Sequence, residues 1–145
     1  MKARTRNPTV GFVSLDRADC FEELRAILLP YAPTLHVFAD RPGNLHLDTH
    51  HVMRNGKALF FGAVRLRASY VSFHLMPLYV FPELAAAIPS ALRSRMHGKS
   101  CFNFTRPDPA LFRQLARLTA KGFSRYQKAG YVVGERPGCL DCAHR

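Results

Sequence analysis

The feature that most constrains the fold of this chain is a series of short strand-like segments between residues 35 and 76. The segments LHVFAD and NLHLDTH flank Arg41-Pro42-Gly43, whose turn-forming residues predict a hairpin. Asn55-Gly56, a strong turn dipeptide, precedes the apolar segment KALFFGAVRL. Strands that follow one another through tight turns pair as antiparallel neighbours, so this region predicts a meander.

The last of these segments, ASYVSFHLM, alternates in polarity. Its odd positions from 71 to 75 are apolar, and its even positions include Ser72 and His74. Successive side chains of a strand point to opposite faces of the sheet. We therefore expect one face of the sheet to lie on a core and the other to be more polar.

Helical patterns flank the strand-like region. We expect a first helix over residues 16–31, a broken helix over 82–88 and 90–96, and a long helix over 109–129 that begins at Asp108-Pro109. SCFNF predicts a fifth strand between the last two. This order predicts an α+β fold, in which an antiparallel sheet of about five strands has helices packed on one face, as a two-layer sandwich.

Length and composition fit one domain. The chain has 145 residues, and we expect an N-terminal arm over 1–15, a domain over 16–131 and a C-terminal tail over 132–145. The 11 phenylalanines and the lack of tryptophan predict a phenylalanine-rich core. No apolar run approaches the ~20 residues that span a bilayer. No apolar signal core follows the basic start, so we expect a soluble, cytoplasmic protein with no membrane partner.

The chain is strongly basic, with 21 lysines and arginines against 10 acidic residues and a net charge of +11. Such a surface attracts nucleic acids, phosphorylated ligands and acidic proteins. Basic residues recur at spacings of three or four on the last predicted helix, where they form a stripe that can follow a phosphate backbone. The alternative is the ordinary solvated face of an amphipathic helix. The stripe consists of Arg113, Arg117, Lys121, Arg125 and Lys128.

Three stretches, NGKALFFGAVRLRASYVSFHLMPLY, GKSCFNFTRPDPALFRQL and GFSRY, carry a resemblance to a known family. Together they resemble the YdhG-like family of small bacterial proteins, a domain of unknown function, over residues 31–131. The resemblance implies an α+β fold with an antiparallel sheet and supplies no catalytic residues. Some relatives are labelled frataxin-like iron chaperones. Iron(II) is favoured by carboxylates, so the excess of basic over acidic residues disfavours that role here.

The segment NLHLDTHH is a candidate metal site. On a strand, His46, Asp48 and His50 point to the same face, and two imidazoles with a carboxylate are typical iron or zinc ligands. At ~3.3 Å per residue, however, the two histidines are ~13 Å apart, whereas a metal–imidazole bond is about 2 Å long. A shared metal therefore requires a bulge near Asp48 or a ligand from another strand. The alternative is the polar face of a hairpin.

Cys139-x-x-Cys142, followed by His144, forms half of a zinc-binding pattern. A structural zinc site has four ligands, and the sequence holds no second Cys-x-x-Cys and no histidine pair at finger spacing. The alternative is a flexible tail in which metal binding or disulfide formation is adventitious. Cys20 and Cys101 fall in a predicted helix and a predicted strand, where we expect small buried side chains.

A small-ligand site is a further hypothesis. Tyr70 and His74 share the more polar sheet face, where Asn103 of the neighbouring segment can join them, and Lys99 can hold an anion near the strand end. Gly98-Lys99-Ser100 is not a phosphate-binding P-loop, because the required first glycine is replaced by an arginine. The alternative is a solvated lysine beside a structural histidine.

No nucleophile–base pair, carboxylate dyad or glycine-rich cradle is evident in the sequence, and we expect no cofactor. The leading hypothesis is a non-catalytic cytoplasmic domain that binds a small ligand or a protein partner through its sheet face. Weak nucleic-acid binding through the last helix is the second hypothesis, and iron or zinc handling is the third. An uncovered strand edge would favour a homodimer.

Overall fold

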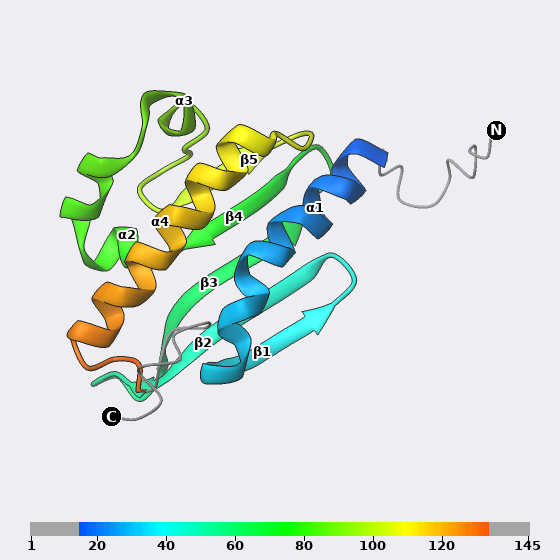
Figure 1. Ribbon diagram of the computed structural model, residues 1–145. Helices are drawn as coiled ribbons and strands as arrows, with labels where there is room; N and C mark the ends of the chain where they lie inside the picture. Colours follow the sequence, from blue (N-terminus) through cyan, green and yellow to red (C-terminus); the bar gives the residue numbers. More distant parts are fainter. Residues whose placement is uncertain (1–14, 134–145) are drawn as a thin grey trace.

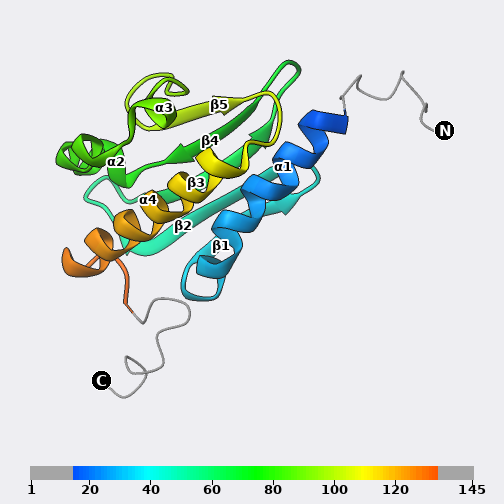
Figure 2. The same ribbon diagram turned by 45° about the horizontal axis from the view of Figure 1, so that its top comes forward.

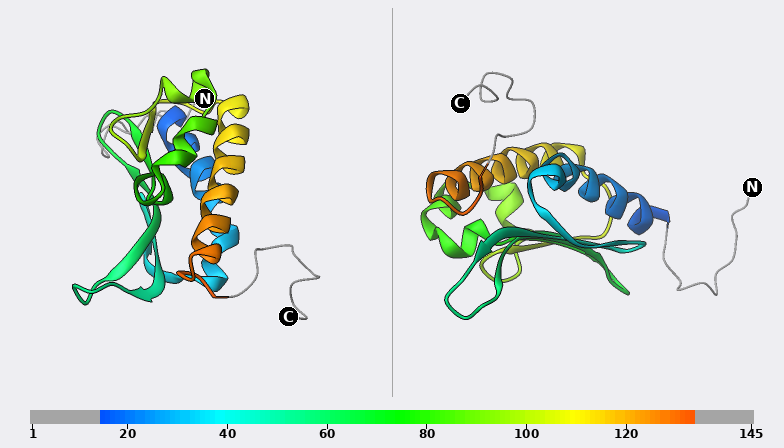
Figure 3. Two further views of the ribbon diagram at one scale, coloured as in Figure 1. Left: turned by 90° about the vertical axis from the view of Figure 1, so that its left-hand side faces the viewer. Right: turned by 90° about the horizontal axis from the view of Figure 1, so that it is seen from below.

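A computed structural model describes residues 15–133 of the chain. These residues form two layers, a five-stranded sheet and a layer of helices that covers one of its faces (Figures 1 and 3). The two longest helices, α1 (Leu15–Leu28) and α4 (Pro109–Lys128), run side by side across the sheet (Figure 2). The predicted two-layer α+β fold is confirmed.

The sheet is an antiparallel meander in which the strands lie in sequence order, β1-β2-β3-β4-β5. Two hairpins turn at Gly43 and Gly56, whose positive φ values suit glycine. The fifth strand is reached only after a helical excursion. The strands are β1 (His36–Arg41), β2 (Asn44–Val52), β3 (Ala58–Leu66), β4 (Val71–Leu75) and β5 (Cys101–Phe104).

The helical segments differ from expectation where prolines are frequent. The first helix ends at Leu28 and continues as a 3-10 helix, η2 (Leu29–Thr34), because Pro30 and Pro33 cannot donate the hydrogen bonds of an α-helix. The expected helix over 82–88 is a 3-10 helix, η3 (Pro82–Ala87), and the expected helix over 90–96 is the shorter α3 (Ser90–Arg93). A four-residue helix that we did not expect, α2 (Pro77–Val80), follows β4.

The core lies between the two layers and is rich in phenylalanine, as predicted. The odd positions of β4 are buried and its even positions are half-buried, which confirms the predicted alternation. Cys20 is fully buried, and burial together with the charge of Glu23 raises the pKa of its thiol to about 12. Cys101 lies on the face of the sheet that points away from this core and is only half-buried. The buried phenylalanines are Phe21, Phe61, Phe73, Phe102, Phe104, Phe112 and Phe123.

Helix α4 is fixed at both ends by polar contacts. The side chain of Asp108 accepts a hydrogen bond from the backbone N–H of Leu111, which caps the start of the helix. Near the other end, the Tyr126 hydroxyl donates to the carbonyl oxygen of Phe60 at 2.8 Å. This contact ties the helix directly to β3.

One residue of β3 is bulged. Leu47 lies opposite Gly62, whereas the next residue of β2, Asp48, lies opposite Phe60, so Phe61 has no partner in the ladder. A bulge bends its strand and re-aims the side chains on either side. The sheet arches, and the face without helices is on the inner side of the arch (Figure 3). We call this face the free face.

The two edges of the sheet differ. The edge of β5 is covered by the segment before it. The backbone N–H of His97 donates to the carbonyl oxygen of Cys101, and the backbone N–H of Asn103 donates to the carbonyl oxygen of Arg95. Strand β1 forms the other edge and carries the exposed side chain of Phe38. None of the helices within residues 15–133 combines the length and apolar character needed to cross a membrane.

Candidate ligand-binding face of the sheet

A row of hydrogen-bonding side chains crosses the free face. Asn44 lies opposite Arg65, Arg65 lies opposite Ser72, and Ser72 lies opposite Asn103. All four side chains are half-buried. Directly opposite residues on antiparallel strands have Cα atoms about 4.5–5.5 Å apart, so these side chains are neighbours. We call these four residues the polar row.

Arg65 is the charged member of the polar row. Its Nη2 donates a hydrogen bond to Nδ1 of His46 at 3.2 Å, and its Nε lies 3.5 Å from Oδ1 of Asn44. No carboxylate among residues 15–133 lies within ion-pair distance of its guanidinium. The guanidinium is therefore held in place by neutral groups, and its positive charge is not neutralised by a described carboxylate.

The contact with Arg65 determines the tautomer of His46. A guanidinium has only donors, so Nδ1 of His46 accepts, and Nε2 carries the hydrogen that is donated to Oδ1 of Asp48 at 2.8 Å. Both ring nitrogens are thus engaged. A metal ion would have to displace Arg65 or Asp48 to bind this ring.

The structure does not assemble the metal site considered for NLHLDTHH. His46 and Asp48 contact each other, but the ring of His50 lies beside that of His36, with centroids 6.2 Å apart. No group of three or more metal-ligating side chains occurs among residues 15–133. The physical reason is the length of the extended strand, which separates His46 from His50. The other metal candidates, Cys139, Cys142 and His144, lie outside the described residues.

His74 lies beside the polar row and forms a hydrogen bond of 2.8 Å between its Nε2 and the hydroxyl of Ser100. Phe60 separates His74 from His46, with ring centroids 4.9 and 4.6 Å away. Burial lowers the pKa of His74 below its ordinary 6.5, and the positive charge of Arg65 acts in the same direction. His74 is therefore a neutral hydrogen-bonding group at neutral pH.

The contact between Ser100 and His74 resembles a nucleophile–base pair, which the sequence did not reveal. Acyl transfer also needs free N–H donors for the oxyanion. The nearby backbone N–H groups of Leu75, His97 and Asn103 are already bonded to carbonyl oxygens. These three N–H groups are therefore not free to bind an oxyanion.

The lowered pKa of His74 predicts a pH dependence of stability. The unfolded chain binds a proton on this residue near pH 6.5, whereas the folded protein resists it, so the free energy of unfolding falls as the pH drops through 6.5. We expect His74→Gln to reduce this slope in urea unfolding measured between about pH 7.5 and pH 5. His97→Gln, in an exposed loop, is the control and should keep it. An unchanged slope in His74→Gln would contradict the prediction.

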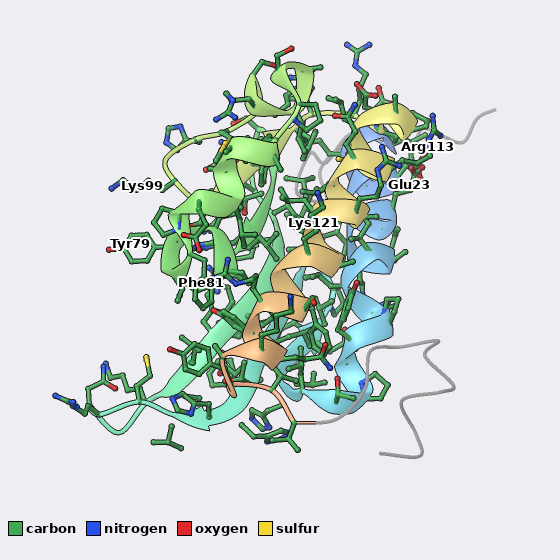
Figure 4. The ribbon with its side chains drawn as sticks, turned by 60° about the vertical axis from the view of Figure 1, so that its left-hand side comes forward. Glu23, Tyr79, Phe81, Lys99, Arg113 and Lys121 are labelled. Atoms are coloured by element: carbon green, nitrogen blue, oxygen red, sulfur yellow. The ribbon has the colours of Figure 1, made fainter. Side chains whose placement is uncertain are left out.

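The remaining ligand candidates lie in different places. Asn103 belongs to the polar row, whereas Tyr70 lies in the turn before β4. Lys99 lies away from the row and lines a hollow of about 560 Å³ next to α2, together with Tyr79. Figure 4 shows the side chains of Lys99 and Tyr79 pointing outward on the same side of the molecule. The structure thus places His74 and Asn103 on one site and Lys99 on another.

The basic stripe of α4 is exposed except at one position. Arg125 is half-buried, because its guanidinium lies 2.7 Å from the Glu83 carboxylate and 4.1 Å from the centre of the Phe81 ring. This pairing interrupts the predicted stripe near its end. The stripe residues that remain exposed are Arg113, Arg117, Lys121 and Lys128, of which Arg113 and Lys121 are labelled in Figure 4.

The sequence did not single out Arg65, Ser72 or Ser100 as site residues. Ser72 carried a signal as a polar residue in an alternating strand, and Arg65 carried one as the charged residue of the otherwise apolar β3. Their proximity to each other depends on the register of β3 with β4. Ser100 lies just before β5, and only the folded chain brings it to His74.

Comparison of the chain with protein-family models, with curated proteins and with solved structures found no match. The resemblance to the YdhG-like family therefore stays a prediction from the sequence motifs.

Proposed function

We propose that this protein binds small anionic molecules, which carry a carboxylate or a phosphate group, on the free face of its sheet. The observation that carries this proposal is the guanidinium of Arg65, which lies in the polar row with no carboxylate partner among the described residues. Arginine presents a planar fork of donors that matches carboxylate and phosphate oxygens.

The neighbours of Arg65 support this chemistry. His46 and Asn44 accept from the Nη2 and Nε side of the guanidinium, which restricts its orientation before a ligand arrives. Ser72 and Asn103 continue the row with a hydroxyl and an amide, which can donate to further oxygens of the same ligand. The net charge of +11 raises the local concentration of anions.

The test is a titration of the ¹⁵N-labelled full chain with succinate and, separately, with inorganic phosphate, followed by NMR. We expect shifts of the Arg65 Nε–H signal and of the Ser72 and Asn103 amides. Arg65→Met should raise Kd about 10- to 100-fold, since a hydrogen bond to a charged group contributes about 1.5–3 kcal/mol. Arg67→Met removes the same charge from the exposed turn after β3 and should change Kd by less than about twofold.

Two results would overturn the proposal. Equal weakening by Arg65→Met and Arg67→Met would mean that the anions are attracted only by the net charge. Signals of the polar row that do not move at saturating succinate or phosphate would place binding elsewhere.

Nucleic-acid binding by α4 is a second candidate. Arg117 and Lys121 are exposed and line a shallow hollow between α4 and η3, and the exposed aromatic ring of Tyr79 lies on the side of the molecule shown in Figure 4. Charge reversal at Arg117 and Lys121 separates the two candidates. It should weaken binding of a single-stranded oligonucleotide at low salt and leave succinate binding unchanged.

A further inference from the structure

Four rings form a continuous row across the free face, beside the polar row. The first four strands contribute one ring each. The centroids of neighbouring rings are 5.0, 4.6 and 4.9 Å apart, which is the spacing of direct aromatic contact. We call these rings the aromatic row, and in order across the sheet they are Phe38, His46, Phe60 and His74.

Phe38 presents an open ring at the β1 end of the aromatic row. The register of β1 with β2 shifts between Val37 and Ala39, so Phe38 has no partner in the ladder. A bulge of this kind re-aims a side chain, and the Phe38 ring lies against that of His46 while the residue is 65% exposed. Phe60, on the other side of His46, is half-buried. A planar group can therefore stack on this end of the row from the face that has no helices (Figure 3).

His46 joins the aromatic row to the polar row. Its Nδ1 accepts from Arg65, and its ring contacts those of Phe38 and Phe60. The guanidinium is therefore separated from the two phenylalanines by the width of one imidazole. A ligand that binds Arg65 through an anionic group can reach these rings with an aromatic group held a few bonds away from its charge.

We propose that the free face binds anions that carry an aromatic ring, and that nucleoside monophosphates are the class it fits. The phosphate binds Arg65, and the base stacks on Phe38 and Phe60. The sugar supplies the spacing between the two. This inference rests on the proposed anion binding by the polar row and names the class of anion.

The charges on the free face set the direction of the ligand. Asp48 and Arg65 contact opposite nitrogens of the His46 ring. Asp48 also lies opposite Phe60 in the register of β2 with β3, which puts its carboxylate at the stacking end. A carboxylate repels a phosphate group but accepts hydrogen bonds from the amino groups of bases. The phosphate therefore lies toward Arg65 and the base toward Phe60.

The test compares the binding of adenosine monophosphate (AMP) and of ribose 5-phosphate, the same anion without the base, to the full chain by calorimetry. We expect AMP to bind about 5- to 100-fold more tightly, because stacking of the base on aromatic side chains supplies the difference. Phenyl phosphate, which has a ring but no sugar between ring and charge, should bind less tightly than AMP. In NMR spectra, the H2 and H8 signals of bound AMP should move upfield in the ring current of Phe38.

Phe38→Ala is the decisive variant, because this exposed side chain contributes little to the core. It should weaken AMP binding about fivefold or more, reduce the upfield shift, and change the Kd of ribose 5-phosphate by less than about twofold. Tyr79→Ala is the matched control, since it removes a similarly exposed ring from α2. It should change neither Kd. Circular dichroism checks that both variants are folded.

The outcomes separate this inference from the proposed function. Equal Kd values for AMP and ribose 5-phosphate, both weakened by Arg65→Met, would overturn the aromatic preference and leave anion binding intact. If neither ligand binds, both proposals fail. Equal weakening of AMP by Phe38→Ala and Tyr79→Ala would exclude the aromatic row as the stacking site. Phenyl phosphate that binds as tightly as AMP would overturn the assignment to nucleoside monophosphates.

Discussion

Phe61→Ala is expected to lower the free energy of unfolding by about 3–5 kcal/mol, because it leaves a large cavity in the core. The Phe61 side chain is fully buried between the sheet and the helices. Its ring lies 5.6–5.8 Å from those of Tyr31, Phe123 and Tyr126. Equilibrium unfolding in urea, followed by circular dichroism, measures the effect.

Phe60→Ala is the matched control, because the two phenylalanines are adjacent in the strand and the bulge puts Phe61, not Phe60, in the core. Phe60 is half-buried on the free face, between His46 and His74. It should lose less than half as much stability as Phe61→Ala, since it loses less buried area. A larger loss in Phe60→Ala would mean that the strand has the opposite register.

Gly122→Ala is expected to destabilise the protein by up to about 2 kcal/mol, although alanine forms helices better than glycine does. A Cβ atom at this position would lie 2.9 Å from Cβ and 3.0 Å from Cγ of Pro77, which packs against α4. Overpacking typically costs about 1–3 kcal/mol, and a contact under 3 Å with a proline ring puts this site above the low end of that range, so the cost exceeds the gain of about 1 kcal/mol in helix propensity. Urea unfolding again measures the difference.

Ser124→Ala, two residues further along α4, is the control for helix propensity. Its side chain is half-buried, and alanine should leave stability unchanged or raise it by a few tenths of a kcal/mol. If Gly122→Ala instead stabilised the protein, α2 would not pack closely on α4.

Much of the fold could be predicted, because the signals are local. The turn residues at Gly43 and Gly56 and the alternation within β4 depend only on neighbours in the chain. The same holds for the start of α4 at Asp108 and Pro109. The proline-rich segments were less predictable, since a single missing N–H decides between an α-helix and a 3-10 helix.

The free face was harder to predict, because neighbours across strands depend on register. Counting alternation back from the buried Val64 places Phe60 in the core and Phe61 on the free face. The bulge opposite Leu47 and Asp48 reverses this order. A shift of one residue moves every following side chain to the other face, and short-range sequence patterns do not reveal it.

For the metal-site hypotheses too, local strand geometry predicted one part and only the tertiary structure decided the other. Strand geometry alone indicated that His46 and His50 are too far apart to share a metal ion with Asp48 on a straight strand, and in the structure Asp48 contacts only His46 of these two histidines. That His50 lies beside His36 follows only from the pairing of β1 with β2.

By itself, the sequence determined the meander, the faces of β4 and the apolar side of α4, because side-chain periodicity follows from backbone geometry. The tertiary structure decided which of two adjacent phenylalanines enters the core and which polar groups surround Arg65. Those outcomes depend on the register and bending of the whole sheet, which no short segment of the sequence determines on its own.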